Sequence, residues 1–321
     1  MPILKLGHDT VTPYTSVPLG IYREISPGGV YQIPQNKFKF EISSDATDIG
    51  DNALQYAFYQ APHVYEVSAP SITQITGANA LYEAFDSCPD IETVNFANLQ
   101  SISGPNSFYN TFMNCEKLEN LNLSNLREIK ITSNQGYTMN QTFMNCTSLK
   151  TLDLHNLEEI GNYETINRAT YLLFRGCTAL ESVDLSKLRL IGYYGALRMF
   201  ESNFSLTDVN LDSLEVVERY GLSATFQSCM SLESVNFKSL NEIWAASLNQ
   251  TFAACRNLKT LYFPALTNDG FKTGSTHMAN MLSGVTGCTV HMRSDLNDTI
   301  RNYAYIRNGF GGTNTTVLFD L

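Results

Sequence analysis

Apolar residues recur along most of this chain at one fixed set of spacings. In residues 112–129 a Phe is followed three positions later by a Cys, and apolar residues stand three, six, eight, eleven and fourteen positions beyond that Cys. These positions hold Phe112, Cys115, Leu118, Leu121, Leu123, Leu126 and Ile129. The frame fits eight units, which begin at Phe58, Phe85, Phe112, Phe143, Phe174, Phe200, Phe226 and Phe252, at steps of 26 to 31 residues. Such a period is typical of a solenoid.

The spacing inside a unit predicts how one coil is built. Leu121 and Leu123 flank Asn122 with a period of two, which indicates a short strand with both leucines on its inner face. The step from Phe112 to Cys115 suits a helical turn or short helix before the strand. Because one coil cannot cover this apolar surface, neighbouring coils must stack. The prediction is an α/β fold: a right-handed solenoid of about eight coils with a parallel β-sheet along one face.

The repeat stops short of both ends of the chain. Residues 1–45 are rich in Pro, Gly and strand-forming residues, and we expect them to form a β-rich N-terminal cap over the first coil. Residues 46–288 are predicted to be the solenoid. Residues 289–321 lose the frame and are predicted to be a C-terminal cap that closes the last coil.

Six of the seven cysteines occupy one repeat position each, and Asn203 stands at that position in another unit. They are Cys88, Cys115, Cys146, Cys177, Cys229 and Cys255. No C-x-x-C pair and no His at ligand spacing accompanies them, so no metal site is predicted. Sulfurs one strand spacing apart are too distant for a disulfide. We therefore expect a buried, reduced column, in which Asn203 bonds to open backbone groups of a turn.

The charge and composition of the chain argue against some classes of binding partner. The net charge is −10, with 31 acidic against 21 basic residues, which argues against nucleic acid and against anionic membrane. The sequence contains no run of 18 apolar residues, so no membrane-spanning helix is predicted. The first residues lack the apolar stretch of a secretory signal. Export by another route, assembly inside a cell and a removed signal all stay open.

The rhythm F-x-x-C-x-x-L-x-x-V-x-L-x-x-L-x-x-I-G, seen in residues 173–192, resembles the BspA-like leucine-rich repeats of bacterial surface proteins. The closing FGGTNTTVLFDL is similar to the ends of such proteins from gut bacteria and their phages. Leu126, Leu157 and Leu188 stand where other leucine-rich repeats have Asn, so the Asn ladder of those repeats is not expected. The resemblance implies adhesion or binding through a repeat scaffold, at a cell surface, in secreted form or on a virion, and supplies no catalytic residue.

The coils differ in length almost only between the last Ile of one unit and the Phe of the next. Aromatic residues in these variable segments are Tyr109, Tyr137, Tyr163, Tyr171, Tyr193, Tyr194, Tyr220 and Trp244. The longest segments end successive coils and are expected to be adjacent, which would bring together Tyr137, Tyr163, Tyr171, Asn134 and Asn162. Rings beside amides suit a sugar or protein ligand. The alternative is that these rings only cover the core.

A second candidate surface is an outward polar stripe on the strands. It consists of Asn95, Asn122, Asp153, Asp184, Asn210, Asn236 and Tyr262. Asn122, Asp153 and Asp184 could read a carbohydrate or an extended peptide. The alternative is a ladder of side-chain amides that supports the strands.

Two classes of function follow from these patterns. The first is a non-enzymatic binding or adhesion protein that recognises a surface protein or glycan of a host or neighbouring cell. The second is an architectural subunit, such as a spacer or virion component, without a ligand of its own. No catalytic motif accompanies the five scattered histidines, and no cofactor is predicted. Exposed and clustered aromatic residues would favour binding, whereas buried ones would favour the spacer.

Overall fold

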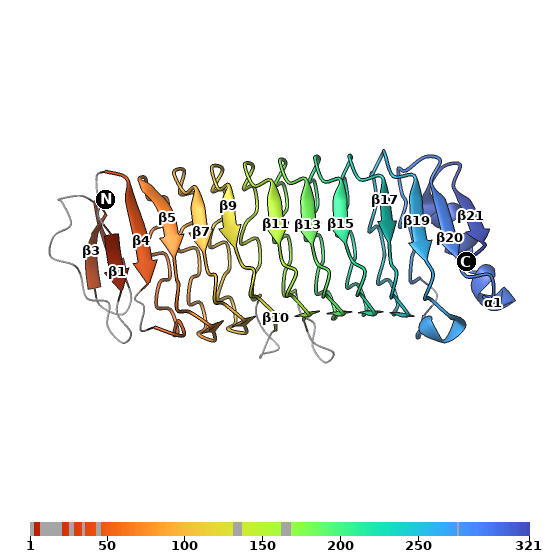
Figure 1. Ribbon diagram of the computed structural model, residues 1–321, viewed down its shortest axis with the longest axis horizontal. Helices are drawn as coiled ribbons and strands as arrows, with labels where there is room; N and C mark the ends of the chain where they lie inside the picture. The colour runs from red at the N-terminus through yellow and green to blue at the C-terminus, as the bar shows by residue number, and fades with distance from the viewer. Residues whose placement is uncertain are drawn as a thin grey trace.

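The computed structural model is an elongated stack of coils that follow one another in sequence order from end to end (Figure 1). It describes residues 36–42, 46–130, 137–161, 168–274 and 276–321, and the backbone of the strands at 3–6, 21–25 and 29–33. The predicted parallel solenoid is confirmed, with about ten coils rather than eight.

The first strand of each coil lies on one face of the stack, here called the strand face (Figure 1). Its strands are β1 (Ile3–Leu6), β4 (Phe38–Ile42), β5 (Val64–Ser68), β7 (Thr93–Asn95), β9 (Asn120–Asn122), β11 (Thr151–Asp153), β13 (Ser182–Asp184), β15 (Asp208–Asn210), β17 (Ser234–Asn236), β19 (Thr260–Phe263), β20 (Thr289–Met292) and β21 (Thr316–Phe319). They do not form one sheet. The parallel pairing is interrupted between β9 and β11 and again between β15 and β17.

The second strand of each coil is only two residues long, and these strands form one continuous parallel sheet. They are β6 (Gln74–Ile75), β8 (Ser101–Ile102), β10 (Glu128–Ile129), β12 (Glu159–Ile160), β14 (Leu190–Ile191), β16 (Val216–Val217) and β18 (Glu242–Ile243). Ile102 pairs with Ile129, and Ile129 with Ile160, so the last apolar position of each repeat is in register.

The ladder continues into both regions that the sequence assigns to caps. At the N-terminal end β1 pairs in parallel with β4, and β2 (Ile21–Ile25) and β3 (Gly29–Ile33) form an antiparallel hairpin. At the C-terminal end β20 and β21 extend the sheet beside β19. Helices in the described residues are short and lie towards this end: η1 (Asn268–Gly270), α1 (Asp298–Arg301), α2 (Ala304–Arg307) and η2 (Gly309–Gly311). These extra strands account for the higher number of coils.

Between the second strand and the Cys position, each coil runs through a segment of tight turns rather than the expected short helix. Amides alternate in direction along it. The amide of Phe85 donates to the carbonyl of Thr111 in the next coil at 2.9 Å, whereas that of Ala84 donates to Leu81 in its own coil at 3.0 Å. Half of the backbone groups are therefore satisfied only by the adjacent coil, which a helix would not allow.

A column of phenylalanine rings runs through the centre of the stack. Neighbouring rings from Phe58 to Phe252 are stacked, with centroids 5.1 to 5.7 Å apart. Each ring in this run is buried. Full burial of aromatic rings at van der Waals contact is the largest apolar contribution that a repeat of this composition offers.

The cysteine column lies directly beside the rings. The thiol of Cys115 donates to the carbonyl of Phe85 one coil earlier at 3.3 Å, and that of Cys146 donates to Phe112 at 3.4 Å. All seven cysteines are buried and free. Burial raises the pKa of the Cys177 thiol to about 12, so the sulfur keeps the proton that it donates. The expected burial of the cysteine column is confirmed for these residues.

Asn203 differs from what the sequence predicts. It is fully buried at the Cys position, but its side-chain nitrogen and oxygen have no hydrogen-bond partner. The expectation that open groups of a turn would satisfy it is therefore wrong, because the neighbouring turn amides already bond along the chain or to the next coil. An unpaired buried amide costs about 1–3 kcal/mol.

Asn203→Cys should stabilise the protein by about 1–3 kcal/mol, because the thiol can donate to the carbonyl of Phe174 as the other cysteines do to theirs. The measurement is the urea unfolding midpoint in reducing buffer. The matched reverse change, Cys229→Asn, should lower the midpoint. A lower midpoint for Asn203→Cys would mean that the amide is satisfied after all.

Candidate functional site

The stacked turn segments form a second outer surface, here called the turn face. Every fourth residue of a segment has a positive φ, as at Asn106, Asn110 and Asn114, with φ of 53°, 51° and 58°. Asn tolerates this left-handed conformation better than most residues because its amide bonds locally. Since the spacing repeats from coil to coil, these positions line up in columns across the turn face.

One such column begins as a ladder of amides. Asn79 donates its side-chain amide to the Oδ1 of Asn52 at 3.1 Å, and Asn106 donates to Asn79 at 3.2 Å. The backbone amide of Tyr137 then donates to the Oδ1 of Asn106 at 2.9 Å. The amide ladder ends there, and aromatic residues continue the same column.

We call this continuation, together with Tyr171 and Tyr193 beside it, the aromatic strip: Tyr137, Arg168, Tyr171, Tyr193, Tyr194 and Tyr220. The rings of Tyr194 and Tyr220, one coil apart, are stacked at 4.7 Å, and Tyr193 stacks on Tyr194 at 4.6 Å. Each of these side chains is partly exposed. Rigid, partly exposed rings held in a row form a ready contact surface.

Arg168 joins the two halves of the strip. Its guanidinium carbon lies 5.3 Å from the ring centre of Tyr171 and 5.8 Å from that of Tyr194. It also donates to the hydroxyl of Tyr137 at 3.5 Å. No ion pair to a carboxylate holds Arg168 within the described ranges. A planar cation between aromatic faces is attracted to both.

A further run of rings leads towards the strip from the N-terminal side. Tyr56 and Tyr82 lie 5.4 Å apart, Tyr82 and Tyr109 stack at 4.8 Å, and Tyr109 meets Tyr137 edge-on at 6.1 Å. Burial, with smaller effects of the carboxylate of Glu83 and the neighbouring tyrosines, raises the pKa of Tyr82 to about 12. Its hydroxyl therefore stays protonated and able to donate.

The structure places only part of the first predicted site. Tyr137 and Tyr171 are brought together around Arg168, and their segments are adjacent, since the amide of Gln141 donates to the carbonyl of Tyr171 at 2.9 Å. Tyr163, Asn134 and Asn162 lie outside the described residues. Tyr194 and Tyr220 were recognisable as aromatic residues of the variable segments. Their stacking depends on the coil register, which the spacing alone did not give.

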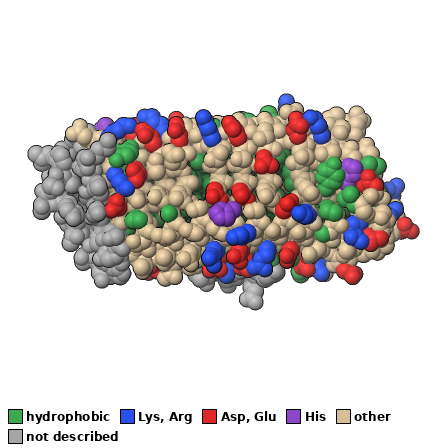
Figure 2. Space-filling view, in the orientation of Figure 1, with side chains coloured by type: hydrophobic (Ala, Val, Ile, Leu, Met, Phe, Trp, Pro, Cys, Tyr) green, Lys and Arg blue, Asp and Glu red, His purple; other side chains and the backbone are tan. Residues whose placement is uncertain are grey.

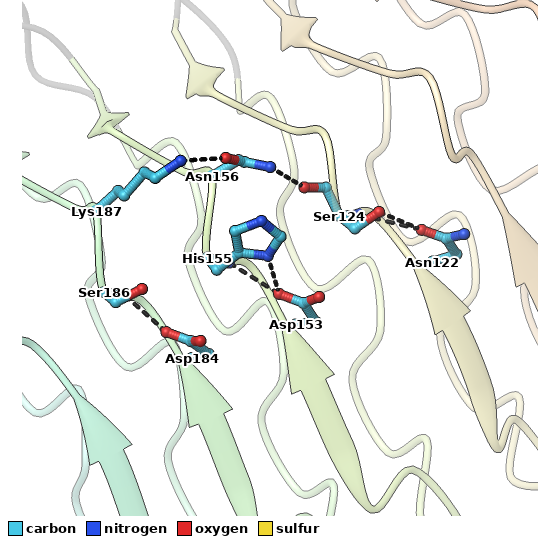
Figure 3. Close-up of polar contacts among 8 residues, drawn as sticks. All are labelled: Asn122, Ser124, Asp153, His155, Asn156, Asp184, Ser186 and Lys187. Carbon is cyan, nitrogen blue, oxygen red and sulfur yellow. Dashed lines mark hydrogen bonds and ion pairs between the residues drawn. The ribbon is translucent and has the colours of Figure 1, made fainter.

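The polar stripe of the strand face has a local role (Figure 3). The Oδ1 of Asn122 accepts from the amide of Ser124 at 3.2 Å, and that of Asp184 accepts from Ser186 at 2.9 Å. The Oδ1 of Asp153 accepts from both the amide and the ring of His155, at 3.0 and 2.6 Å. Each side chain closes the turn after its own strand. The predicted support is therefore a set of Asx turns, not an amide ladder.

Proline explains why two coils have no Asn or Asp at the stripe position. Ser68 and Tyr262 hold the stripe position in two coils, and two residues later stand Pro70 and Pro264. Proline has no amide hydrogen for an Asx side chain to accept. The amide ladder lies on the turns instead, where Asn125 donates to Ala97 at 2.6 Å and other coils repeat the bond.

A shallow depression of about 380 Å³ lies where β9 and β11 fail to pair. Asn122 and Asp153 line it, together with Asn95 and Leu121. Asp184 lies beyond this break and does not line it. The three predicted stripe residues thus share a face without forming one site. Acidic and basic side chains are interspersed over this face, without a broad patch of one sign (Figure 2).

The repeats of this chain match the model of a known protein family. The model of the BspA type leucine rich repeat region (6 copies) matches residues 32–169 and 164–273, which contain all eight repeat units that begin with Phe. The chain belongs to this family.

Solved structures of bacterial leucine-rich repeat proteins resemble this BspA-type chain. A leucine rich cell surface protein of Faecalibacterium prausnitzii is 16% identical and covers 94% of this chain and 86% of its own, with a TM-score of 0.28. A leucine-rich repeat protein of Bacteroides ovatus is 18% identical over 96% and 94%, with a TM-score of 0.32. TpLRR of T. pallidum is 17% identical over 93% and 97%, with a TM-score of 0.34. No curated protein sequence matches significantly.

In the described part of this BspA-type chain, no group of three or more His, Cys, Asp or Glu side chains is placed to hold a metal ion. No helix there is long and apolar enough to cross a membrane.

Asp184→Ala should lower the free energy of unfolding by about 0.5–1.5 kcal/mol, because the amide of Ser186 loses its acceptor. Asp184→Asn keeps an Oδ1 and should be close to wild type. Asn236→Ala removes a side chain of the same column for which the structure records no turn bond, and should cost less than about 0.5 kcal/mol. Equal losses for both alanine variants in urea unfolding would contradict the Asx-turn role.

Proposed function

We propose that this BspA-type chain is a non-enzymatic binding protein whose turn face contacts a surface protein or glycan of a host or neighbouring cell. The observation that carries the proposal is Arg168, held between Tyr171 and Tyr194 and bonded to Tyr137. Tyr and Arg are the residue types most enriched at the energetic centres of binding surfaces.

The exposure of these rings favours binding over a spacer. A ring that only covered the core would be buried, whereas the strip residues keep part of each side chain exposed. Stacking on neighbouring rings fixes their orientation, so little rotamer freedom remains to be lost when a partner binds. The core columns carry the stability of the coils, which leaves the strip available for contact.

The architectural alternative draws its support from the strand face. Asn122, Asp153 and Asp184 are engaged in turns, as a purely structural stripe would be. A spacer needs no row of partly exposed tyrosines, however. We therefore place the contact surface on the turn face and favour a location at a cell surface, in secreted form or on a virion.

Tyr137→Ala combined with Tyr171→Ala should weaken binding at least tenfold, because Arg168 loses two of its three aromatic partners. The measurement is binding of the purified chain to an array of immobilised glycans and extracellular proteins. The thermal unfolding midpoint should change little, since both side chains are partly exposed.

Tyr65→Ala provides the matched control, because Tyr65 is a partly exposed tyrosine on β5, outside the strip. It should bind as wild type. Wild-type binding by the double variant would place the contact elsewhere. Unfolding of the double variant would show that these rings belong to the core, and failure of the wild-type chain to bind the array would favour the spacer.

A further inference from the structure

The aromatic strip ends in a groove that the sequence does not reveal. The groove has a volume of about 430 Å³, within the range of about 300–1,000 Å³ that is typical of small-molecule sites. Its walls are Tyr193, Glu218, Arg219, Trp244, Ala245, Thr273 and Gly274, which come from four successive coils. Two aromatic rings, an acid, a base and a hydroxyl thus converge on one space.

Both aromatic walls are held in place. Tyr193 stacks on Tyr194 at 4.6 Å. The indole Nε1 of Trp244 donates to the Oε1 of Glu242 at 2.8 Å, and Glu242 also pairs with Lys272 at 3.3 Å. Aromatic rings fixed in this way present flat apolar faces with a polar rim. The apolar faces of a sugar ring are complementary to such walls.

The acidic side chain of the groove, Glu218, is nearly inaccessible to bulk solvent. Glu218 is 6% exposed, although it borders the groove. Burial raises the pKa of its carboxyl to about 7, the backbone amide of Tyr193 acts in the opposite direction, and the charge of Glu242 adds to the rise. Near neutral pH much of Glu218 is therefore protonated and can donate a hydrogen bond.

The basic side chain of the groove, Arg219, is free to bind a ligand. Arg219 is exposed, and no carboxylate lies within ion-pair distance of it in the part of the chain that the structure describes. Lys272, which precedes the groove residue Thr273, is already engaged with Glu242. A guanidinium presents two parallel donors to a carboxylate, which a neutral sugar cannot use in the same way.

The shape of the groove depends on a close backbone approach. Gly274 has a φ of +120°, and a Cβ there would lie 2.7 Å from the Cβ of Ala245. Only glycine combines this conformation with such a contact. The wall formed by these two residues therefore stays free of side chains beyond a methyl group, which keeps the space between Trp244 and Thr273 open.

We propose that this groove binds a carboxylate-bearing pyranose of the hexuronic acid class. The ring packs against Trp244 and Tyr193, the carboxylate meets Arg219, and ring hydroxyls bond to Glu218 and Thr273. The inference rests on the proposed binding function and names the chemistry of one ligand. Its contacts exclude Tyr137 and Tyr171, so the two proposals can fail separately.

The affinity for such a ligand should fall as the pH rises. Glu218 faces Arg219 on its own segment, Tyr193 from the preceding coil and Glu242 of β18, which is paired with Lys272. Below pH 7 the Glu218 carboxyl is mostly neutral and donates, whereas above pH 7 its charge repels the ligand carboxylate. A group with a pKa near 7 changes its protonated fraction about tenfold between pH 6 and pH 8.

Trp244 is the only tryptophan of the chain, so its fluorescence reports on the groove directly. We expect D-glucuronate to change this fluorescence saturably at pH 6 and to bind about tenfold more tightly than D-glucose. The affinity should drop about tenfold at pH 8 in the wild type and stay constant in Glu218→Gln. Ligand-observed NMR provides a second readout that does not depend on tryptophan.

Arg219→Gln should lose the preference for glucuronate, while Arg256→Gln, at another exposed arginine, should keep it. Equal affinities for glucuronate and glucose, or full binding by Arg219→Gln, would overturn the inference, as would the absence of binding in both readouts. If the Tyr137 and Tyr171 double variant still loses array binding in that case, the proposed function stands without this ligand.

Discussion

Each coil of this protein is joined to its neighbours through the backbone around its phenylalanine. The carbonyl of Phe85 accepts from the amide of Cys88 in its own coil and from the thiol of Cys115 in the next. Its amide donates forward to Thr111. These groups are buried beside the ring column, where water cannot replace a lost partner. A coil is therefore complete only when another coil lies against it, and this fixes the register of the outer surfaces.

The core could be predicted from the sequence because it depends on one repeated constraint. The strand positions can be predicted from the spacing of Leu121, Leu123 and Ile129. The buried column can be predicted from the repeat position of Cys115. The segments that hold β20 and β21 lack the Phe and Cys signal, so they were assigned to a cap, whereas both strands extend the ladder as further coils. The turn segment was also misjudged, because an i, i+3 apolar step does not distinguish a helix from repeated tight turns.

The proposed binding surface was harder to predict because it depends on contacts between coils. Tyr137 and Tyr171 lie in segments whose lengths single them out, but Arg168 gains its role from rings in two coils. The sequence does not single out Glu218 as a groove residue, because an acidic residue after Val217 is typical of an ordinary turn. The stripe with Asn122 stood out as a regular pattern, yet that regularity reflects the turns that Asn122 and its equivalents in several other coils close.

The measurement that tests this account most directly is residue-resolved amide hydrogen exchange. The amides of Phe85, Phe112 and Phe143 each donate to the next coil, at 2.9, 2.8 and 2.9 Å. If coil-to-coil bonding carries the structure, these amides exchange only when several coils open together, with similar protection at all three. Exchange as fast as that of exposed turn amides, while the strands stay protected, would contradict it.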